Sequence, residues 1–406
     1  MKIINPNYIY TANELLENQA IAFDKSIKKI APLKELKEVY KDAQVIELSE
    51  NSLLMPGLIN AHVHLEFSAN KETLKYGDFL QWLHSVIGNR DELINACDSA
   101  CMKKAVDMML ESGITTYGAV SSYGMDLEVA ASSPQNVVFF NELIGSQATM
   151  ADALFTDFLQ RVDASKKVKR DGFYPAAAIH SPYSVHPILI KKALQMVKNE
   201  GLKLSAHFLE SRAEREWLDK NEGDFKEFFA NFLKQDKAIT DVKEFLQHFE
   251  DIPTLMTHVV KADDKELEEL SKSKHTVVHC PISNRLLGNG AISLDDLDSH
   301  NIRWICATDG LSSNYTLNLF EEMKIALFMH HSADLLSLSE RLIKSVTKDA
   351  ADALGLETGE IKEGKNADML ILDLPSKPSD QFPIHLLLHG YNISKIYING
   401  KQVKGE

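Results

Sequence analysis

His62 and His64 are the residues of this 406-residue chain whose types and spacing most directly suggest chemistry. They follow Pro56-Gly57, which breaks the preceding segment, and Leu58-Ile59, which predict the start of a buried strand. Residues two apart on a strand point to the same face, so both imidazoles face one spot. Two such histidines can supply half of the ligands of a divalent metal. Taken alone the pair is a weak signal, and two ordinary core or surface histidines explain it better.

Short apolar runs that alternate with helical segments predict the elements that would position these histidines. Helical periodicity is clear over residues 100–111, 187–200 and 264–272. The runs that predict strands cover residues 58–63, 114–117, 137–140, 174–179, 202–206, 254–257, 276–278 and 304–307. Eight buried strands alternating with helices predict an α/β fold, a closed (β/α)8 TIM-type barrel. A doubly wound open sheet is the alternative, but no G-x-G-x-x-G turn follows any of these runs.

Both ends of the chain have a different, β-rich pattern. Residues 2–4 and 44–48 near the start, and 367–373 and 395–401 near the end, alternate apolar and polar side chains. Neither end can bury a core alone, so we expect them to pair in one small β-sandwich. The expected domains are residues 1–55 plus 358–406 for the sandwich and 56–357 for the barrel. Residues 210–250, with a cluster of phenylalanines, predict an enlarged helical connection that could wall a pocket.

Histidine or aspartate closes six of the eight predicted strands. These residues are His62 with His64, His180, His207, His258, His279 and Asp309. Active residues of such barrels lie at the carboxyl ends of the strands. Any one histidine there is more often a hydrogen-bonded structural residue than a ligand. The joint pattern favours a metal centre.

The composition excludes several other classes of protein. A net charge of −14 disfavours a nucleic-acid partner, because phosphates would be repelled. No window approaches the ~18 continuous apolar residues of a membrane span, and the first residues do not resemble a signal peptide. The four cysteines are too few and too scattered for a disulfide scaffold. We therefore expect a cytoplasmic protein with no membrane or nucleic-acid partner.

Four motifs and the tail together resemble the amidohydrolase superfamily, in the branch of chlorohydrolases and nucleoside deaminases. They are residues 56–64 (PGLINAHVH), 207–211 (HFLES), 279–284 (HCPISN), 307–310 (ATDG) and 359–368 (GEIKEGKNAD). Within that branch, residues 64–68, 79–83 with Arg90, and 207–218 are most similar to aminofutalosine deaminases. The resemblance covers nearly the whole chain.

The resemblance implies a mononuclear hydrolytic centre. His62, His64, His207 and Asp309 would hold one divalent metal, Zn or Fe(II), because the fourth strand ends in His180 and not in the lysine of binuclear relatives. A metal lowers the pKa of bound water towards ~7. Asp309 would accept that water's proton, and His258 would orient the resulting hydroxide. Glu210 would protonate a ring nitrogen and the departing ammonia; its alternative role is a loop acid paired with Arg212 or Lys220.

The implied reaction is hydrolytic deamination of a small adenine-type nucleoside, with 6-amino-6-deoxyfutalosine the favoured substrate, on the futalosine route to menaquinone. The resemblance places His180, Glu66, Arg90, Tyr183 and Asn314 at the substrate. Arg212 and Arg285 are further candidates to bind the substrate's carboxylate. We also expect a homodimer, as in relatives.

Three alternatives remain open. The chain could deaminate S-adenosylhomocysteine or 5′-methylthioadenosine, although residues 79–90 lack an acid well placed to bind the ribose. It could be a triazine-type chlorohydrolase. A metal-free, noncatalytic scaffold of the same fold is disfavoured because all four ligand positions are intact.

Overall fold

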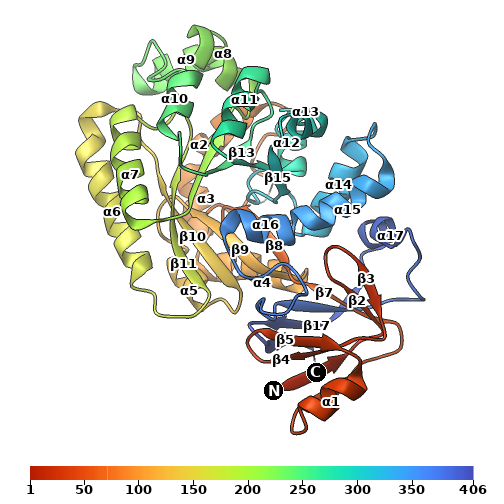
Figure 1. Cartoon of the computed structure of the whole chain (residues 1–406). Coiled ribbons are helices and arrows are strands. Elements are labelled where there is room, and N and C mark those ends of the chain that lie inside the picture. Colours follow the sequence, from red (N-terminus) through yellow and green to blue (C-terminus); the bar gives the residue numbers. More distant parts are fainter. Residues whose placement is uncertain (71, 406) are drawn as a thin grey trace.

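Eight parallel strands form the centre of the molecule in the computed structural model, which describes residues 1–70 and 72–405 (Figure 1). They hydrogen-bond side by side in chain order. Their bounds are β8 (Leu58–Val63), β9 (Ile114–Ser121), β10 (Asn136–Leu143), β11 (Phe173–Ile179), β12 (Leu204–Phe208), β13 (Leu255–His258), β14 (Thr276–His279) and β15 (Arg303–Cys306). Each predicted run overlaps one of these strands. The predicted TIM-type barrel is confirmed.

The barrel closes between its first and last strands. Asp309, just after β15, donates its backbone N–H to the carbonyl of His62 over 3.1 Å. The amide of Asn60 on β8 also bonds Thr308, donating to Oγ1 at 2.7 Å and accepting from the backbone N–H at 3.1 Å. The interior is filled by apolar side chains such as Ile59, Val138 and Ile305. The barrel is therefore a packed core, and its chemistry is confined to its rim.

Helices connect the strands and surround them (Figure 1). Those that follow barrel strands are α2 (Phe79–Gly88), α3 (Arg90–Ala96), α4 (Ser99–Glu111), α5 (Leu127–Ser132), α6 (Ala151–Lys166), α7 (Pro187–Glu200), α8 (Arg212–Lys220), α9 (Asp224–Leu233), α10 (Val242–His248), α11 (Asp264–Lys272), α12 (Pro281–Leu286), α13 (Leu294–Ser299), α14 (Leu319–Met329), α15 (Leu335–Ser345) and α16 (Lys348–Leu354), with the 3-10 turn η1 (Ala148–Met150) before α6. Of the helices in residues 1–70 and 72–405, none has both the length and the apolarity needed to cross a membrane.

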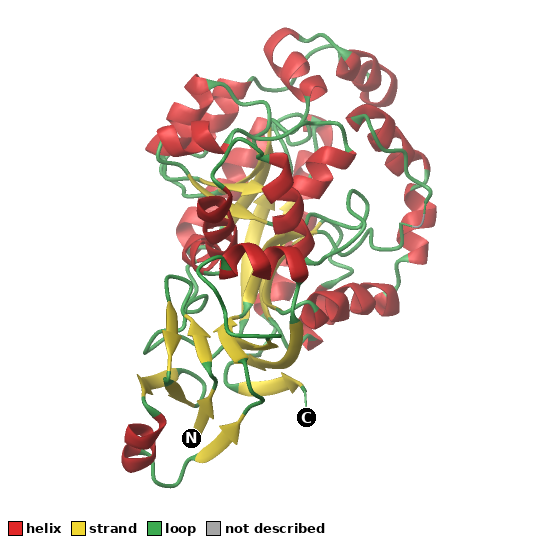
Figure 2. Ribbon diagram, turned by 90° about the vertical axis from the view of Figure 1, so that its right-hand side faces the viewer, coloured by secondary structure: helices red, strands yellow, loops and turns green. Residues whose placement is uncertain are grey.

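Two sheets lie beside the barrel, as Figure 2 shows below the ring of helices; one comes from the N-terminal end of the chain and the other combines both ends. One sheet has the order β5 (Ile27–Ala31), β4 (Ala20–Phe23), β1 (Lys2–Asn5), β6 (Gln44–Glu47). The other has the order β18 (Lys401–Lys404), β17 (Asn392–Ile398), β16 (Met369–Asp373), β7 (Ser52–Pro56), β2 (Tyr8–Tyr10), β3 (Leu15–Glu17). Two further helices, α1 (Leu33–Val39) and α17 (Phe382–His389), accompany them. The predicted pairing of the two chain ends is confirmed.

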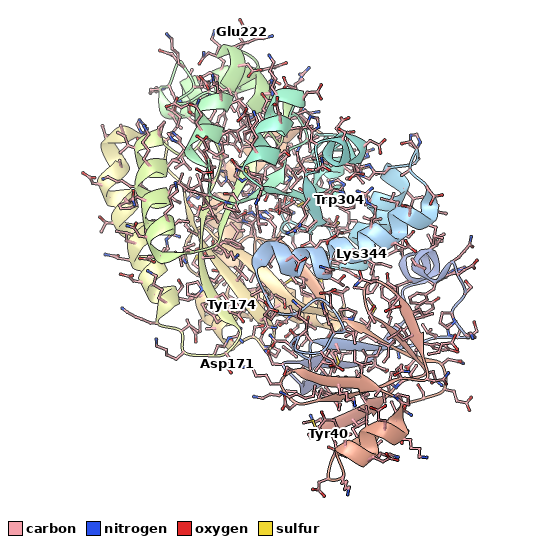
Figure 3. All side chains as sticks on the ribbon, viewed as in Figure 1. Tyr40, Asp171, Tyr174, Glu222, Trp304 and Lys344 are labelled. Atoms are coloured by element: carbon pink, nitrogen blue, oxygen red, sulfur yellow. The ribbon has the colours of Figure 1, made fainter. Side chains whose placement is uncertain are left out.

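The chain passes from sandwich to barrel at Pro56-Gly57. A Cβ on Gly57 would lie 2.1 Å from Oγ1 of Thr115, so no larger residue fits at this crossing. Nearby, Lys25 of the sandwich pairs with Asp171 of the barrel at 2.7 Å, and Figure 3 shows Asp171 at this edge. The expected domain limits, 1–55 plus 358–406 and 56–357, stay a prediction.

The enlarged connection predicted over residues 210–250 consists of α8, α9 and α10. Figure 1 places these helices above the barrel, at the end opposite the sandwich. Phe225, Phe228 and Phe229 of α9 are buried, whereas Phe232 is 54% exposed. The predicted aromatic cluster is thus partly core and partly the wall of a cavity.

Candidate active site

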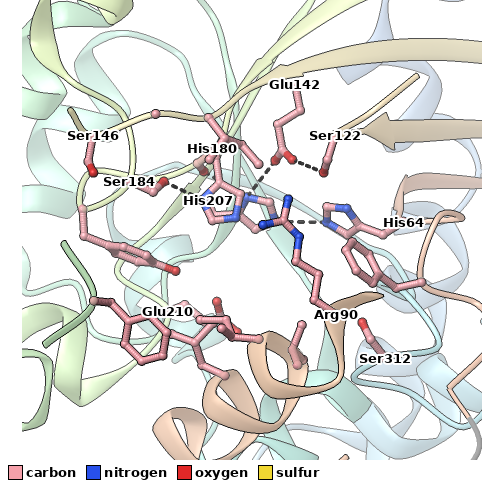
Figure 4. A pocket seen from close by; sticks show the side chains of 18 of the residues that line it. His64, Arg90, Ser122, Glu142, Ser146, His180, Ser184, His207, Glu210 and Ser312 are labelled. Atoms are coloured by element: carbon pink, nitrogen blue, oxygen red, sulfur yellow. Dashed lines mark hydrogen bonds and ion pairs between the residues drawn. The ribbon is translucent and has the colours of Figure 1, made fainter. Parts of the chain in front are cut away.

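A cavity of about 720 Å³ opens at the carboxyl ends of the barrel strands (Figure 4). Its size is within the range of pockets that hold drug-sized molecules. The predicted site residues that line it are His64, Arg90, His180, Tyr183, His207, Glu210, His258 and Asp309. Residues more than 240 positions apart in the chain therefore meet here because parallel strands end at one rim.

Four side chains predicted as metal ligands converge at the floor of the cavity. The Nε2 atoms of His62 and His64 each lie 3.7 Å from Oδ1 of Asp309. The Nε2 atom of His207 lies 3.3 Å from that of His64. Nε2 of His62 is buried and has no hydrogen-bond partner among the described residues. An unpartnered imidazole nitrogen is costly to bury, and three nitrogens with one carboxylate oxygen are the donor set of a zinc-type centre.

The other ring nitrogens fix the orientation of these histidines. Nδ1 of His207 lies 2.9 Å from the carbonyl oxygen of His180, which can only accept, so His207 carries its proton there. Its Nε2 then presents a lone pair to the cluster. Nδ1 of His62 lies 3.4 Å from the hydroxyl of Thr257. Burial lowers the pKa of His62, and burial with the neighbouring histidines lowers that of His207 well below its usual range. Both rings are therefore neutral, as metal ligands must be.

Asp309 stands in a left-handed backbone conformation, with φ of 58°. Such a conformation is uncommon outside glycine and clusters at functional sites. Oδ2 accepts hydrogen bonds from the hydroxyls of Ser283 and Ser313 at 2.7 and 2.8 Å. Burial alone would raise the pKa of Asp309, but contact with His62 and its neighbouring histidines holds it well below the usual range. The carboxylate is thus ionised and can both bind a cation and accept a proton.

His258 closes β13 beside the cluster, with φ of 73°. Its Nδ1 donates to Oδ1 of Asn284 over 2.9 Å, which leaves Nε2 free to face the cavity. Burial lowers the pKa of His258 to about 4, so the ring is neutral near pH 7. A fixed, neutral imidazole in this place can orient a water or hydroxide by accepting its hydrogen.

Glu210 follows the turn after β12, and its Oε2 lies 3.7 Å from Nε2 of His258. Burial raises the pKa of Glu210 well above its usual range, and the charges of Asp309 and Glu214 raise it further. A hydrogen bond of 3.1 Å from Asn289 opposes this shift only in part. Glu210 is therefore a proton donor at neutral pH. The alternative pairing with Arg212 or Lys220 is absent from the ion pairs among the described residues, where Arg212 pairs with Glu216.

The predicted substrate residues His180, Tyr183 and Arg90 all line the cavity, and Figure 4 shows His180 and Arg90 beside His207. Nδ1 of His180 bonds the hydroxyl of Ser184 at 2.6 Å, and burial lowers the pKa of His180. The guanidinium of Arg90 lies over the ring of Tyr123, 5.2 Å from its centroid. Its guanidinium also donates a hydrogen bond to the hydroxyl of Tyr123, so Tyr123 holds Arg90 on the cavity wall through both its ring and its hydroxyl. Arg212 and Arg285 are exposed, and neither lines the cavity.

The structure does not bring Glu66 and Asn314 to the cavity. The strand ends at Val63, so Glu66 does not continue the face of His64 as expected. Its carboxylate accepts backbone hydrogen bonds from Ser122 at 2.7 Å and Met125 at 2.8 Å, which anchors the turn after β9. The amide of Asn314 donates to the carbonyl of Thr308 at 2.7 Å and to Glu322. Both side chains hydrogen-bond to residues of the rim, and that they bind substrate stays a prediction, which these contacts do not support.

Two residues of the site, Glu142 and Asn289, were not predicted from the sequence. Glu142 is the last but one residue of β10 and lines the cavity, and Asn289 donates a hydrogen bond to Glu210. Glu142 could have been found from the sequence, because the polar pair Asn141-Glu142 directly follows the apolar run 137–140. The histidines and the aspartate predicted at the other strand ends likewise follow apolar runs. Asn289 lies in a loop and carried no such signal.

Barrel, rim and donor set together define a metal-dependent hydrolase. The sequence matches the Amidohydrolase family over residues 53–403, so the chain belongs to that family, whose members are metal-dependent enzymes.

The chain is similar to several deaminases over its full length. It is 47% identical to the aminodeoxyfutalosine deaminase of a Nitratiruptor species, over 99% of both chains. It is 33% identical to the adenosine deaminase of Helicobacter pylori, again over 99% of both. A crystal structure of Helicobacter pylori aminofutalosine deaminase with methylthio-coformycin superposes with a TM-score of 0.94 at 32% identity, covering 99% of this chain and 100% of the other. Family and relatives identify the chain as a hydrolytic deaminase.

Proposed function

We propose that this enzyme hydrolyses 6-amino-6-deoxyfutalosine to futalosine and ammonia, a step of the futalosine route to menaquinone. The observation that carries the proposal is the place of the buried Glu210 carboxyl, which lines the same cavity as the ligand cluster, 3.7 Å from Nε2 of His258. Replacing an amino group on a purine by oxygen needs this combination of a proton donor and a hydrolytic centre. The 47% identity to an aminodeoxyfutalosine deaminase supports the choice of substrate.

The residues divide the reaction between them. His62, His64, His207 and Asp309 would hold the metal, which supplies Lewis acidity and a water of lowered pKa. Water oxygen adds to C6 of the purine while Asp309 takes up a proton from it, and His258 accepts a hydrogen bond from the attacking oxygen. Glu210 gives its proton to N1, so the ring becomes a better electrophile. The amino group takes the proton held by Asp309, the C6–N bond breaks and ammonia leaves, while the proton that remains on the added oxygen passes to the ionised Glu210 and C6 becomes a carbonyl.

The outer half of the cavity is suited to a large apolar substituent on the sugar. It is lined by Phe79, Trp82 and Leu83 of α2 and by Phe228 and Phe232 of α9. His84 of α2 also contacts α9, 5.4 Å from the ring of Phe228, so the two helices meet. An adenosine would leave this half empty, whereas an aromatic group beyond the sugar would fill it.

A cation on this apolar wall would recognise a carboxylate on such a group. Arg90 lines the cavity, and among the described ion pairs its guanidinium has no carboxylate partner. The other cavity arginine, Arg161, donates to Asp157 at 2.9 Å and to two backbone carbonyls, those of Ser121 and Glu142. Arg90 is therefore the arginine we assign to the substrate carboxylate, in preference to Arg212 and Arg285.

Zn or Fe(II) suits this ligand set equally, because both accept three imidazoles and one carboxylate. We place the enzyme in the cytoplasm and expect a homodimer.

The proposal is tested by assaying metal-loaded protein for ammonia release and for the ultraviolet shift of the purine. Aminodeoxyfutalosine should be deaminated with a higher kcat/KM than adenosine or 5′-methylthioadenosine. The variant Glu210→Gln should lose about 100-fold or more in kcat, because an amide cannot donate the proton, while its metal content stays unchanged. Ammonia from the other nucleosides but not from aminodeoxyfutalosine would show that the substrate is wrong. Near-normal turnover by E210Q would remove the proton-donor role.

A further inference from the structure

Glu142 is a buried carboxylate on the cavity wall that the deamination steps above do not use. It is the last but one residue of β10 and is fully buried. Its Oε2 accepts a hydrogen bond of 2.6 Å from the hydroxyl of Ser122. Its Oε1 has no hydrogen-bond partner among the described residues. A buried carboxylate oxygen without a donor is costly, so a donor from outside the protein is expected at this atom.

Support of the ligand His207 does not account for Glu142. Oε1 lies 3.8 Å from Nδ1 of His207, beyond hydrogen-bond distance. That nitrogen already donates to the carbonyl of His180. The carboxylate of Glu142 also lies near His180 and His207 in a group that could hold a cation. Nδ1 of His180 is engaged with Ser184 and Nδ1 of His207 with a carbonyl, so a second metal would have to displace existing bonds.

The other carboxylates on the cavity wall have partners or tasks. Asp309 and Glu210 serve the hydrolytic centre, and Asp157 accepts from Arg161 at 2.9 Å. Helix α2, which also lines the cavity, contains no acidic residue. Glu142 is thus the free acceptor among the described carboxylates that line the cavity.

The position of Glu142 relative to Glu210 indicates which part of a nucleoside would meet it. Figure 4 shows the two carboxylates on opposite sides of His207. When N1 of the purine faces Glu210, the sugar-bearing N9 is at the far end of the base. The donors that remain at that end are the hydroxyls of the sugar.

We propose that Glu142 binds the substrate by accepting a hydrogen bond from a ribose hydroxyl through Oε1, with Ser122 holding the carboxylate in place. This proposal rests on the proposed function and adds a specificity residue to it. The enzyme should therefore discriminate against nucleosides that lack the 2′- and 3′-hydroxyls.

The variant Glu142→Gln tests the proposal. The amide conserves volume, but when its oxygen accepts from Ser122 it turns an NH₂ donor towards the cavity. We expect the ratio of kcat/KM for adenosine to that for 2′,3′-dideoxyadenosine to fall about 10- to 100-fold relative to wild type, the usual size of a hydrogen bond to a charged group. Asp157→Asn, which changes a partnered carboxylate on the same cavity, should keep the wild-type ratio.

Equilibrium binding gives a readout that does not depend on turnover. Inosine should lose affinity in E142Q by a similar factor, while 2′,3′-dideoxyinosine should bind both proteins alike. Equal losses for both nucleosides would overturn the proposal and assign Glu142 to support of His207. A wild-type enzyme that binds inosine but deaminates none of the adenine nucleosides would instead contradict the proposed function, and the binding ratio would still decide the role of Glu142.

Discussion

At the scale of single residues, the turn that carries Glu210 depends on a second buried acid, Glu214. Its two carboxylate oxygens accept the backbone N–H groups of Leu209 at 3.1 Å and Glu210 at 2.8 Å. Its own N–H donates to the hydroxyl of Ser211, the residue that caps α8. Leu209 is left-handed, with φ of 47°, so these bonds stabilise a strained turn. Glu214 therefore sets the place from which Glu210 donates its proton.

Glu214 should make the stability of the enzyme depend on pH. Burial raises its pKa from 4.5 to about 7. Between these values the folded state keeps a proton that the unfolded state has released, so the stabilising contribution is complete below about pH 4.5 and is lost as pH rises to 7. The full loss is about 3 kcal/mol. In Glu214→Gln, which cannot ionise, the free energy of unfolding should fall less steeply over this range when both proteins are unfolded in urea. Parallel curves for wild type and E214Q would contradict the assignment.

The sequence could place the site residues that lie at strand ends, but not those whose position depends on a turn or a loop. Residues that end strands, such as His207 and His258, could be placed from the chain alone because the parallel barrel brings every strand end to one rim. Glu66 could not, because its place depended on whether the strand continued past Val63, and the turn that follows decides this. Asn289 could not either, since the path of its loop is set by tertiary packing.

At the scale of elements, α2 and α9 form a wall that the sequence indicated only as an aromatic cluster. The ring of Phe232 lies 5.0 Å from that of Phe228 and 6.3 Å from that of His84. Phenylalanines spaced three and four apart indicated one face of a helix, but not what that face covers. The structure shows that α9 faces both the core and the cavity. Its exposed end is available to a substrate.

Phe232→Ala should lower kcat/KM for aminodeoxyfutalosine about fivefold and leave that for adenosine unchanged. The reason is the loss of about 1 kcal/mol of apolar contact with a substituent that adenosine lacks. Phe328→Ala is the matched control, because Phe328 on α14 is similarly exposed, at 65% against 54%, and does not line the cavity. Steady-state kinetics give kcat/KM of both variants for aminodeoxyfutalosine and for adenosine. An equal decrease for the two nucleosides in F232A would place the sugar substituent elsewhere.

At the scale of the whole molecule, one hydrophobic core cluster extends from the sandwich to the helices around the barrel, beside the separate clusters inside the barrel and inside the sandwich. Leu53, Leu370 and Ile396 of the sandwich sheet belong to the same buried cluster as Met109 and Leu342 of the helices around the barrel. The pairing of the chain ends could be predicted from their β patterns. This shared core could not, because it depends on the faces that the two units turn to each other.

Asp368 fixes this junction by polar contacts. Its buried carboxylate accepts from Asn136 of β10 at 3.0 Å, from the hydroxyl of Thr358 at 2.8 Å and from the backbone of Asn399 at 2.6 Å. Its carbonyl accepts from Gly57 at 2.9 Å, where sandwich leads into barrel. One residue thus connects the first crossing, a barrel strand and the last hairpin of the chain.

Asp368→Ala should therefore destabilise the molecule as a unit, by about 3 kcal/mol or more, since it leaves buried donors on Asn136 and Thr358 without acceptors. In scanning calorimetry we expect one unfolding transition for wild type and one, at lower temperature, for D368A. Asp171→Ala is the control: it removes the exposed ion pair with Lys25 across the same junction, and the transition should not move. Two separate transitions in D368A, with the later one unchanged from wild type, would show that sandwich and barrel are independent units. We expect a single shifted transition because the sandwich and the barrel share a hydrophobic cluster and are both hydrogen-bonded to the carboxylate of Asp368.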